Sequence, residues 1–474
     1  MQRAPHRKKQ RSAFVQLMDL PLFLLIFGVA SVSMFIPALH GGAARNLDTA
    51  RMFFYCAILG VTFFTLIAIA HAGRRDRRGP LGSLMSLFAT FVFLPAFLAI
   101  PFYEGLGTTT YLNAYVEMVS AITTTGATLF EDPERLDGTL HLWRAQVGWM
   151  GGAVMWIAAS AILAPLNLGG FEVTAQAEPG QREARSSLIG RADPRERLVR
   201  VTAALLPIYI GLTVLLWVLL LASGDRPLVS LSHAMSIMAT SGISPVGGVQ
   251  YSGSGITGEA VMLLFMLFAL SRLTFASDTV TATQSGLRTD PEFRLGILLV
   301  LGVPVILFLR HWLGALDVSA EDDIGQAAGA LWGSVFTVMS FLTTTGFVSE
   351  NWVQAQAWSG LETPGLILMG LALIGGGVAT TAGGETAARL CALSQRAARD
   401  GTTCASLIGQ QRRLPNTADT AQRGLYRMDI LHALRPDTCR IDDPAGGFGG
   451  FLSGRAGVEH RGSVHHRTVD HFCC

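Results

Sequence analysis

Charge is scarce in this sequence, and lysine is almost missing. Only 15% of the 474 residues are charged, and Lys8 and Lys9 are the only lysines. An ordinary soluble domain carries roughly a quarter charged residues. With a net charge of +2 and no basic stripe, the chain does not fit a protein that binds nucleic acid.

The sequence also lacks the residue sets that catalysis or a metal centre requires. We find no nucleotide-binding glycine loop of a recognised type and no convergent group of acids, histidines or cysteines within an apolar stretch. The histidines and cysteines near the C-terminus match no standard zinc spacing; they are His465, His466, His471, Cys473 and Cys474. We therefore expect no enzyme activity, no cofactor and no transition-metal site.

Long apolar runs, by contrast, are abundant. Half of the residues are hydrophobic, and no polar linker divides the first 400 residues. Eight stretches come close to the about 20 residues that a membrane-spanning helix needs; they are 21–40, 51–72, 82–103, 145–166, 198–222, 258–280, 291–314 and 364–388. The first is too long for a signal peptide and is followed at once by a second. We predict an all-α polytopic membrane protein embedded in the lipid bilayer.

Basic residues gather on one side of these spans if successive spans cross in alternating directions. They cluster before the first span, between the second and third, and after the fourth, at residues 7–11, 74–78 and 182–197. Cytoplasmic loops hold the excess of positive charge. The N-terminus is therefore predicted to be cytoplasmic.

Three related segments lie between the predicted spans. Each joins an apolar stretch too short to cross a membrane to a hydroxyl-rich turn that ends in Gly126, Gly242 or Gly346. A re-entrant helix suits such a segment, and irregular backbone at membrane depth is tolerated only where it is buried in protein or lines a watery cavity. We therefore predict repeated helix, pore-loop, helix units, as in potassium channels, after two leading transmembrane helices.

The turns have the composition of a cation filter. Such a filter needs backbone carbonyl oxygens that replace the hydration shell of an ion, and glycine allows the irregular backbone that presents them. The second turn lacks a triple threonine, which predicts reduced symmetry and modest selectivity. We assign the filter, with potassium as the substrate held there, to Thr124, Thr125, Gly126, Thr240, Ser241, Gly242, Thr344, Thr345 and Gly346.

Acidic residues near the first turn have two readings each. Glu117 lies inside the first short apolar stretch, where it either raises the local cation concentration or anchors the filter by hydrogen bonds; we favour the anchor. Glu131 and Asp132 follow the turn and either draw cations to the mouth or are ordinary solvated loop acids.

These motifs also carry a family resemblance. The segments at 122–128 and 342–347 resemble the first and third filter signatures of the Trk/Ktr/HKT superfamily, specifically the bacterial TrkH-type membrane subunit. The stretches 142–152 with 177–180 and 374–384 resemble two further motifs of that family, in its order. The likeness covers roughly residues 14–400.

The resemblance implies a homodimer with one pore per subunit, in the bacterial cytoplasmic membrane, controlled by a cytoplasmic nucleotide-binding TrkA-like subunit. It also implies a movable gate in the glycine-rich break after the third filter, although the same small residues suit helix packing. Glu385 stands where the family more often has a basic residue. The gate residues would be Gly375, Gly376, Gly377, Thr380, Thr381, Gly383 and Gly384.

After about residue 400 the sequence changes character. The tail has no spanning stretch and no tryptophan, and it holds four of the six cysteines. The two helices and the fourth filter that the family has in this region are not visible. We hypothesise that the tail is translated out of frame, which the nucleotide sequence tests directly.

The predicted organisation follows from these features. The parts are 1–80, the N-terminal tail and two leading helices; 81–175, the first pore unit; 198–285, the second; 290–400, the third with the gate; and 401–474, a non-matching tail, disordered or out of frame in place of a fourth unit. The predicted function is potassium uptake driven by the membrane potential. A sodium-coupled or sodium-conducting relative and a truncated, non-conducting product remain as alternatives.

Overall fold

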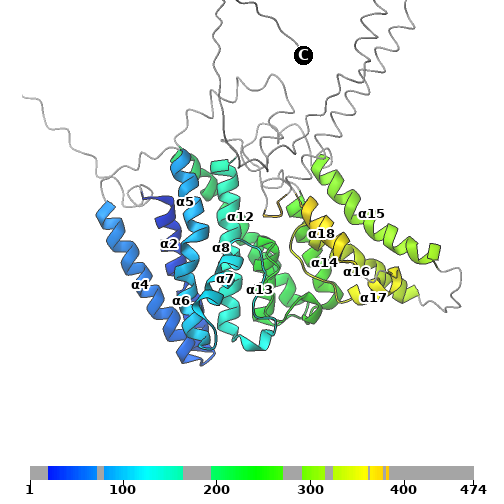
Figure 1. Ribbon diagram of the computed structural model, residues 1–474, viewed down its shortest axis with the longest axis horizontal. Coiled ribbons are helices and arrows are strands. Elements are labelled where there is room, and N and C mark those ends of the chain that lie inside the picture. Colours follow the sequence, from blue (N-terminus) through cyan, green and yellow to red (C-terminus); the bar gives the residue numbers. More distant parts are fainter. Residues whose placement is uncertain are drawn as a thin grey trace, which may run out of the picture. The chain divides into compact units, whose positions relative to one another are not determined.

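The structure, a computed structural model, describes residues 20–71, 80–163, 194–270, 291–314, 324–360, 363–376 and 381–383. All the regular structure in these residues is helical (Figure 1). The chain divides into Met1–Thr402 and Thr403–Cys474, and every described residue belongs to the first part. The predicted tail 401–474, with its histidines and cysteines, lies outside the described residues, as does Glu385.

The described chain begins with a helical hairpin, and the first arm of this hairpin is bent. The elements are α2 (Leu22–Ser33), α3 (Phe35–Ala43) and α4 (Leu47–His71). The bend between α2 and α3 has a local cause, because the ring of Pro37 would meet the carbonyl of Ser33, the last residue of α2. Both α2 and α3 pack against α4.

The predicted first pore unit begins with a similar proline break and then has a short helix. Its elements are α5 (Pro80–Val92), α6 (Leu94–Leu106), α7 (Tyr111–Ile122), the 3-10 turn η1 (Pro133–Arg135) and α8 (Gly138–Ala158), which continues as a π-helix, η2 (Ala159–Leu163). Pro95 interrupts the α5–α6 span in the way that Pro37 interrupts the first span. Asp137 caps α8 by accepting a hydrogen bond from the Leu140 amide at 2.7 Å.

The second and third units follow the same order. The second has α12 (Pro194–Ala222), α13 (Pro227–Ala239), η3 (Val249–Tyr251), α14 (Gly255–Met266) and η4 (Leu267–Leu270). The third has α15 (Pro291–Gly314), α16 (Ile324–Leu342), α17 (Trp352–Ser359) and α18 (Gly365–Ile374). Helix α13 packs against α8 and α12, while α16 packs against α14, α15 and α18.

Six of the described helices are long and apolar enough to cross a membrane. The fourth begins at Gly138, seven residues before its predicted start, because the helix continues through the polar residues at its N-terminal end. The predicted spans 258–280 and 364–388 are represented only by α14 with η4 and by α18, since their remaining residues lie partly outside the described part. The short helix α17 was not predicted.

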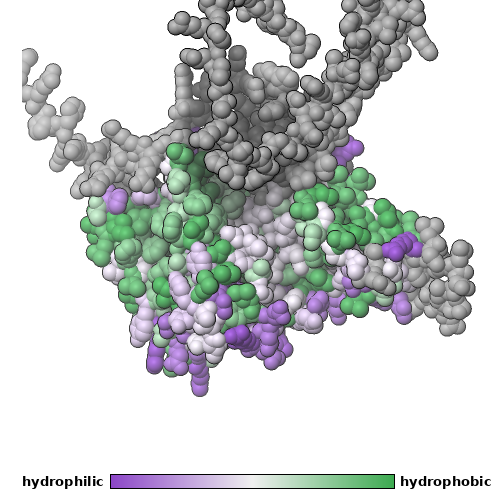
Figure 2. All heavy atoms as spheres, viewed as in Figure 1, coloured by the Kyte–Doolittle hydropathy of each residue, from purple (hydrophilic) through white to green (hydrophobic). Residues whose placement is uncertain are grey.

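Hydrophobic side chains face outward from the described helices. Leu66, Leu298 and Leu366 are 62%, 66% and 76% exposed, as expected for surfaces in contact with lipid. Figure 2 shows hydrophobic residues across the body of the helices and hydrophilic ones along its lower edge. Inside, one apolar core joins the leading helices to the first unit, and another joins the second and third units.

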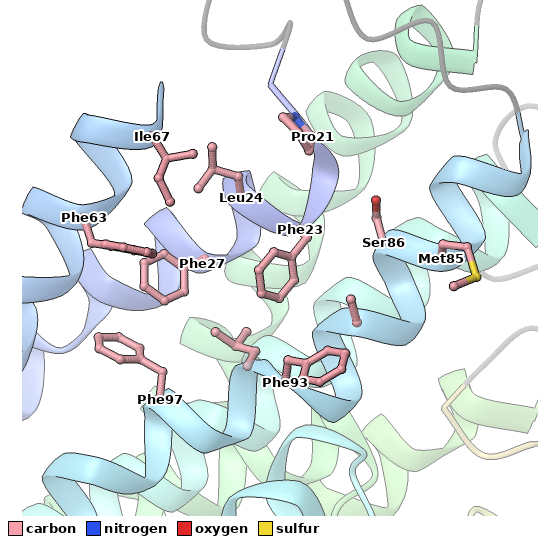
Figure 3. Close-up of a pocket in the computed structure, with 12 residues that line it drawn as sticks. Pro21, Phe23, Leu24, Phe27, Phe63, Ile67, Met85, Ser86, Phe93 and Phe97 are labelled. Carbon is pink, nitrogen blue, oxygen red and sulfur yellow. The ribbon is translucent and has the colours of Figure 1, made fainter. Parts of the chain in front are cut away.

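An apolar cavity of about 430 Å³ lies among α2, α4, α5 and α6. Aromatic rings surround it, including those of Phe23, Phe27, Phe63 and Phe97 (Figure 3). Ser86 is the one side chain in its lining with a polar group. Such a lining offers an ion no ligands, so the cavity is not part of a conduction path.

Candidate ion-conduction site

The three predicted filter turns share one backbone conformation. Two residues before each glycine stands a threonine in the left-handed region, with φ of 56° at Thr124, 48° at Thr240 and 56° at Thr344. The glycines themselves also have positive φ: 71° at Gly126, 66° at Gly242 and 79° at Gly346. Threonine pays a conformational cost there, so three repeats of this geometry mark a conformation that the surrounding structure imposes.

A serine in the last turn of each preceding helix, α7, α13 or α16, holds the filter turn. It stands six residues before the glycine, and its carbonyl accepts a hydrogen bond from the amide just before that glycine. The distances are 2.9 Å from Thr125 to Ser120, 3.0 Å from Ser241 to Ser236 and 2.8 Å from Thr345 to Ser340. These bonds reverse the chain tightly after the helix.

The turns lie next to one another although they are far apart in sequence. A Cβ atom at Gly126 would overlap the carbonyl oxygen of Ser241, and one at Gly242 would overlap the carbonyl oxygen of Thr345. The first turn therefore abuts the second, and the second abuts the third. Only glycine permits this approach, which explains why the first two turns end in glycine.

The position next to Gly346 differs. No described atom lies within 4 Å of a Cβ built on Gly346. At the other end of the series, Thr123 and Thr125 are exposed, whereas the matching Thr343 and Thr345 are buried. The described residues thus form three consecutive members of a ring, whose remaining side they leave open.

The second turn diverges in side chains and not in backbone. Thr123 and Thr125 share a hydrogen bond between their hydroxyls at 2.8 Å, and Thr343 and Thr345 do so at 3.1 Å. Ala239 replaces the first of these threonines in the second turn, where the Ser236 and Ser241 hydroxyls lie 3.2 Å apart instead. The reduced symmetry predicted from the sequence is therefore confined to side chains in these turns.

A buried ion pair stands behind the first turn. Arg144 Nη2 on α8 lies 2.6 Å from Glu117 Oε1 on α7, and both side chains are at most 5% exposed. The second oxygen of Glu117 accepts a hydrogen bond from the amide of Leu129 at 3.0 Å. Of the two readings of Glu117, the anchor agrees with these contacts. Glu131 and Asp132 are exposed in the loop that follows.

The glycine-rich segment after the third turn is described in part. Helix α18 ends at Ile374, and Gly375 leaves the helix with φ of 73°. Gly376 packs so closely against the carbonyl of Ala269 that a Cβ would lie 2.5 Å from its oxygen. Thr381 and Gly383 are also described, while Gly377, Thr380 and Gly384 lie outside the described residues. Both the helix break and the close packing that the sequence left open occur here.

Several contributors went unrecognised in the sequence. The serines that hold the turns recur at a constant distance from each glycine, a periodicity that would have revealed them. Arg144 and Glu259 are buried partners of the turns, but each comes from a helix other than the one that precedes the turn it contacts. No local motif announces them.

Comparisons with known proteins agree with this arrangement. No protein-family model matches the chain. It is 29% identical to the Trk system potassium uptake protein TrkI of Halomonas elongata over 300 residues, which cover 62% of this chain and 56% of the relative. It is 28% identical to TrkH of Salmonella typhimurium over 350 residues, which cover 72% of this chain and 68% of the relative. The chain therefore spans little more than half of the length of the TrkI relative.

A solved structure matches the fold. The crystal structure of the potassium transporter TrkH from Vibrio parahaemolyticus matches with a TM-score of 0.64 at 21% identity, over 86% of this chain and 79% of that one. Fold and site thus define an all-helical, multi-span membrane protein with the architecture of TrkH. In sequence the chain is similar to the TrkH and TrkI potassium uptake proteins.

Proposed function

We propose that this chain carries potassium ions into the cell through a pore lined by the backbone carbonyls of its filter turns. One observation carries the proposal: three turns with matched positive φ values lie edge to edge, with Gly126 and Gly242 each against the carbonyl that precedes the next turn's glycine. A ring of carbonyl oxygens is the coordination that replaces potassium's hydration shell. The relatives named as potassium uptake proteins support the same substrate.

The membrane potential supplies the driving force, about 2.3 kcal/mol for each charge per 100 mV. The filter residues are the nine assigned from sequence. The glycine-rich segment from Gly375 to Gly384 acts as the gate, because an unwound helix next to the filter can move without unfolding a span.

The assembly proposed is that of the Trk system. The chain works as a homodimer in the bacterial cytoplasmic membrane, with its N-terminus in the cytoplasm and with a TrkA-like nucleotide-binding subunit as its regulator. The similarity to the Trk system proteins TrkI and TrkH supports this assembly. The pore units keep the boundaries 81–175, 198–285 and 290–400.

Growth of a potassium-uptake-deficient bacterium at low external potassium tests the function, together with rubidium and sodium uptake. The chain and a version with the restored reading frame after residue 400 are each expressed with the regulator. Rubidium uptake by the chain is the expected result. Uptake by the restored version alone would identify this chain as a non-conducting product, and sodium without rubidium would favour the sodium-conducting alternative. Uptake of neither ion by either version contradicts the proposal.

A further inference from the structure

The chain leaving each filter turn is held from behind at one common register. Nine residues before the turn glycine, the preceding helix (α7, α13 or α16) carries Glu117, His233 or Thr337. Glu117 accepts the amide hydrogen of Leu129 at 3.0 Å, and Thr337 Oγ1 accepts that of Ser349 at 3.3 Å. Leu129 and Ser349 each stand three residues after the glycine. His233 Nε2 lies 2.9 Å from Ser244 Oγ, two residues after its glycine.

The three braces differ in strength because their side chains differ. Glu117 offers a charged carboxylate that Arg144 pairs with at 2.6 Å. Thr337 offers one neutral hydroxyl oxygen. Hydrogen bonds to ionised acceptors are stronger than neutral ones, so by its own helix the third turn is held less firmly than the first.

Another carboxylate supplies what Thr337 lacks, and it comes from the neighbouring unit. Glu259, on α14 of the second unit, is fully buried. Its Oε2 accepts hydrogen bonds from Trp332 Nε1 and Ser349 Oγ, both at 2.8 Å, and its Oε1 accepts the amide hydrogen of Glu350 at 2.7 Å. All three donors belong to the third unit. The Glu259 side chain therefore joins helix α16 of that unit to the segment that follows the third filter turn.

This carboxylate is costly to bury, since no ion pair joins it to a lysine, arginine or histidine within the described residues. An uncompensated buried charge is stabilised only by well-formed hydrogen bonds. The three short contacts provide these hydrogen bonds, and two of them form only if Ser349 and Glu350 stay in their present positions. We call these three hydrogen bonds to Glu259 the clamp.

We infer that Glu259 is a positioning residue of the third filter turn. From the second pore unit, its side chain holds the segment after Gly346 in place and so fixes the carbonyl spacing on which ion selectivity depends. The consequence for selectivity rests on the proposed function. The clamp itself does not, and the two are tested by separate measurements.

Hydrogen exchange of the peptide containing residues 347–352 tests the clamp in the full chain. The Glu350 amide is expected to exchange at least about tenfold faster in Glu259→Ala than in the unchanged chain, the factor that corresponds to ~1.4 kcal/mol. Peptides from the first turn serve as the internal reference and should not change. Equal protection of residues 347–352 in both proteins overturns the inference, whether or not the chain conducts.

The ratio of rubidium to sodium uptake in proteoliposomes tests the consequence. Glu259→Gln keeps the shape but loses acceptor capacity and charge, and it is expected to lower the ratio about fivefold, with Glu259→Ala lowering it further. Glu134→Gln, at an exposed acid outside the filter turns, is the matched control and should leave the ratio unchanged.

If Glu259→Ala does not fold, Ser349→Ala decides, because it removes one of the three donors and leaves the carboxylate in place. A normal ratio together with unchanged exchange in Ser349→Ala would contradict the inference. Absence of uptake by the unchanged protein would instead contradict the proposed function, and the exchange experiment would still decide on the clamp.

Discussion

Thr240, in the second filter turn, donates a hydrogen bond from its hydroxyl to the hydroxyl of Thr381 at 2.7 Å. The two residues are 141 positions apart. Thr240 is one of the three threonines held at positive φ, and Thr381 belongs to the glycine-rich segment after α18. One bond thus links a filter turn of the second unit to the candidate gate of the third.

Removing this bond should loosen the candidate gate. In Thr381→Val the side chain keeps its shape but loses the hydroxyl, and one neutral hydrogen bond contributes about 1 kcal/mol. If the bond holds the segment in its obstructing position, steady-state rubidium flux should rise by up to about fivefold. Rubidium uptake in proteoliposomes measures this. Thr65→Val, which removes a hydroxyl bonded only within its own helix α4, is the control, and equal flux in the two variants would contradict the role.

The filter glycines should differ in their tolerance of alanine. Gly126→Ala and Gly242→Ala place a methyl group on a backbone oxygen of the next turn, whereas Gly346→Ala meets no described atom within 4 Å. All three incur strain from positive φ, which is on the order of 1 kcal/mol. Thermal unfolding in detergent should therefore rank Gly346→Ala as the mildest of the three.

A glycine in a helix provides the control for this series. Gly211, within α12, has no atom near a built Cβ, and Gly211→Ala should stabilise by about 0.5–1 kcal/mol because alanine favours helix. Equal losses at Gly126 and Gly346 would mean that the turns do not abut as described.

The buried pair of Glu117 and Arg144 should be asymmetric under mutation. Arg144→Met leaves the Glu117 carboxylate buried without its cation, and breaking such a pair costs about 3–5 kcal/mol. The double variant Glu117→Gln, Arg144→Met removes both charges and should regain much of that loss. Unfolding temperatures of the single and double variants measure the effect; a double variant less stable than Arg144→Met would refute the explanation.

Asp225, in the loop between α12 and α13, should make stability depend on pH. Its Oδ1 accepts the Ser254 amide hydrogen at 2.9 Å, yet burial raises the pKa of the Asp225 carboxyl above its usual value. A raised pKa means that the folded state favours the protonated acid. Its contribution to stability is therefore fully present below the ordinary carboxyl pKa of about 4 and is lost as pH rises through the raised value.

Asp225→Asn should remove this dependence. The difference in unfolding temperature, Asp225→Asn minus the unchanged chain, is expected to increase as pH rises from about 4. His233 Nδ1 lies 4.0 Å from Asp225 Oδ2, so the comparison is repeated in a His233→Gln background, where the difference should persist. If the curves of unfolding temperature against pH run parallel with and without Asp225→Asn, in both backgrounds, Asp225 is not the group whose titration changes stability.

Much of this protein follows from its sequence because the signals are local. Apolar length alone predicts the spans, since a bilayer demands about 20 residues from each. Pro37 and Pro95 break helices through their own rings. Gly126, Gly242 and Gly346 identify the turns because glycine adopts positive φ readily, and at Gly126 and Gly242 a neighbouring carbonyl also leaves no room for a Cβ.

Tertiary structure decided the contacts behind those turns. Arg144 reaches Glu117 from the next helix, and Glu259 reaches Ser349 and Glu350 from the next pore unit. Buried carboxylates need donors, but any of many buried amides and hydroxyls can serve, and only the packing of α8 and α14 selects which ones do. The sequence by itself determined where the chain turns, and the fold determined what holds each turn, because hydrogen-bond partners in a core are chosen by proximity in space.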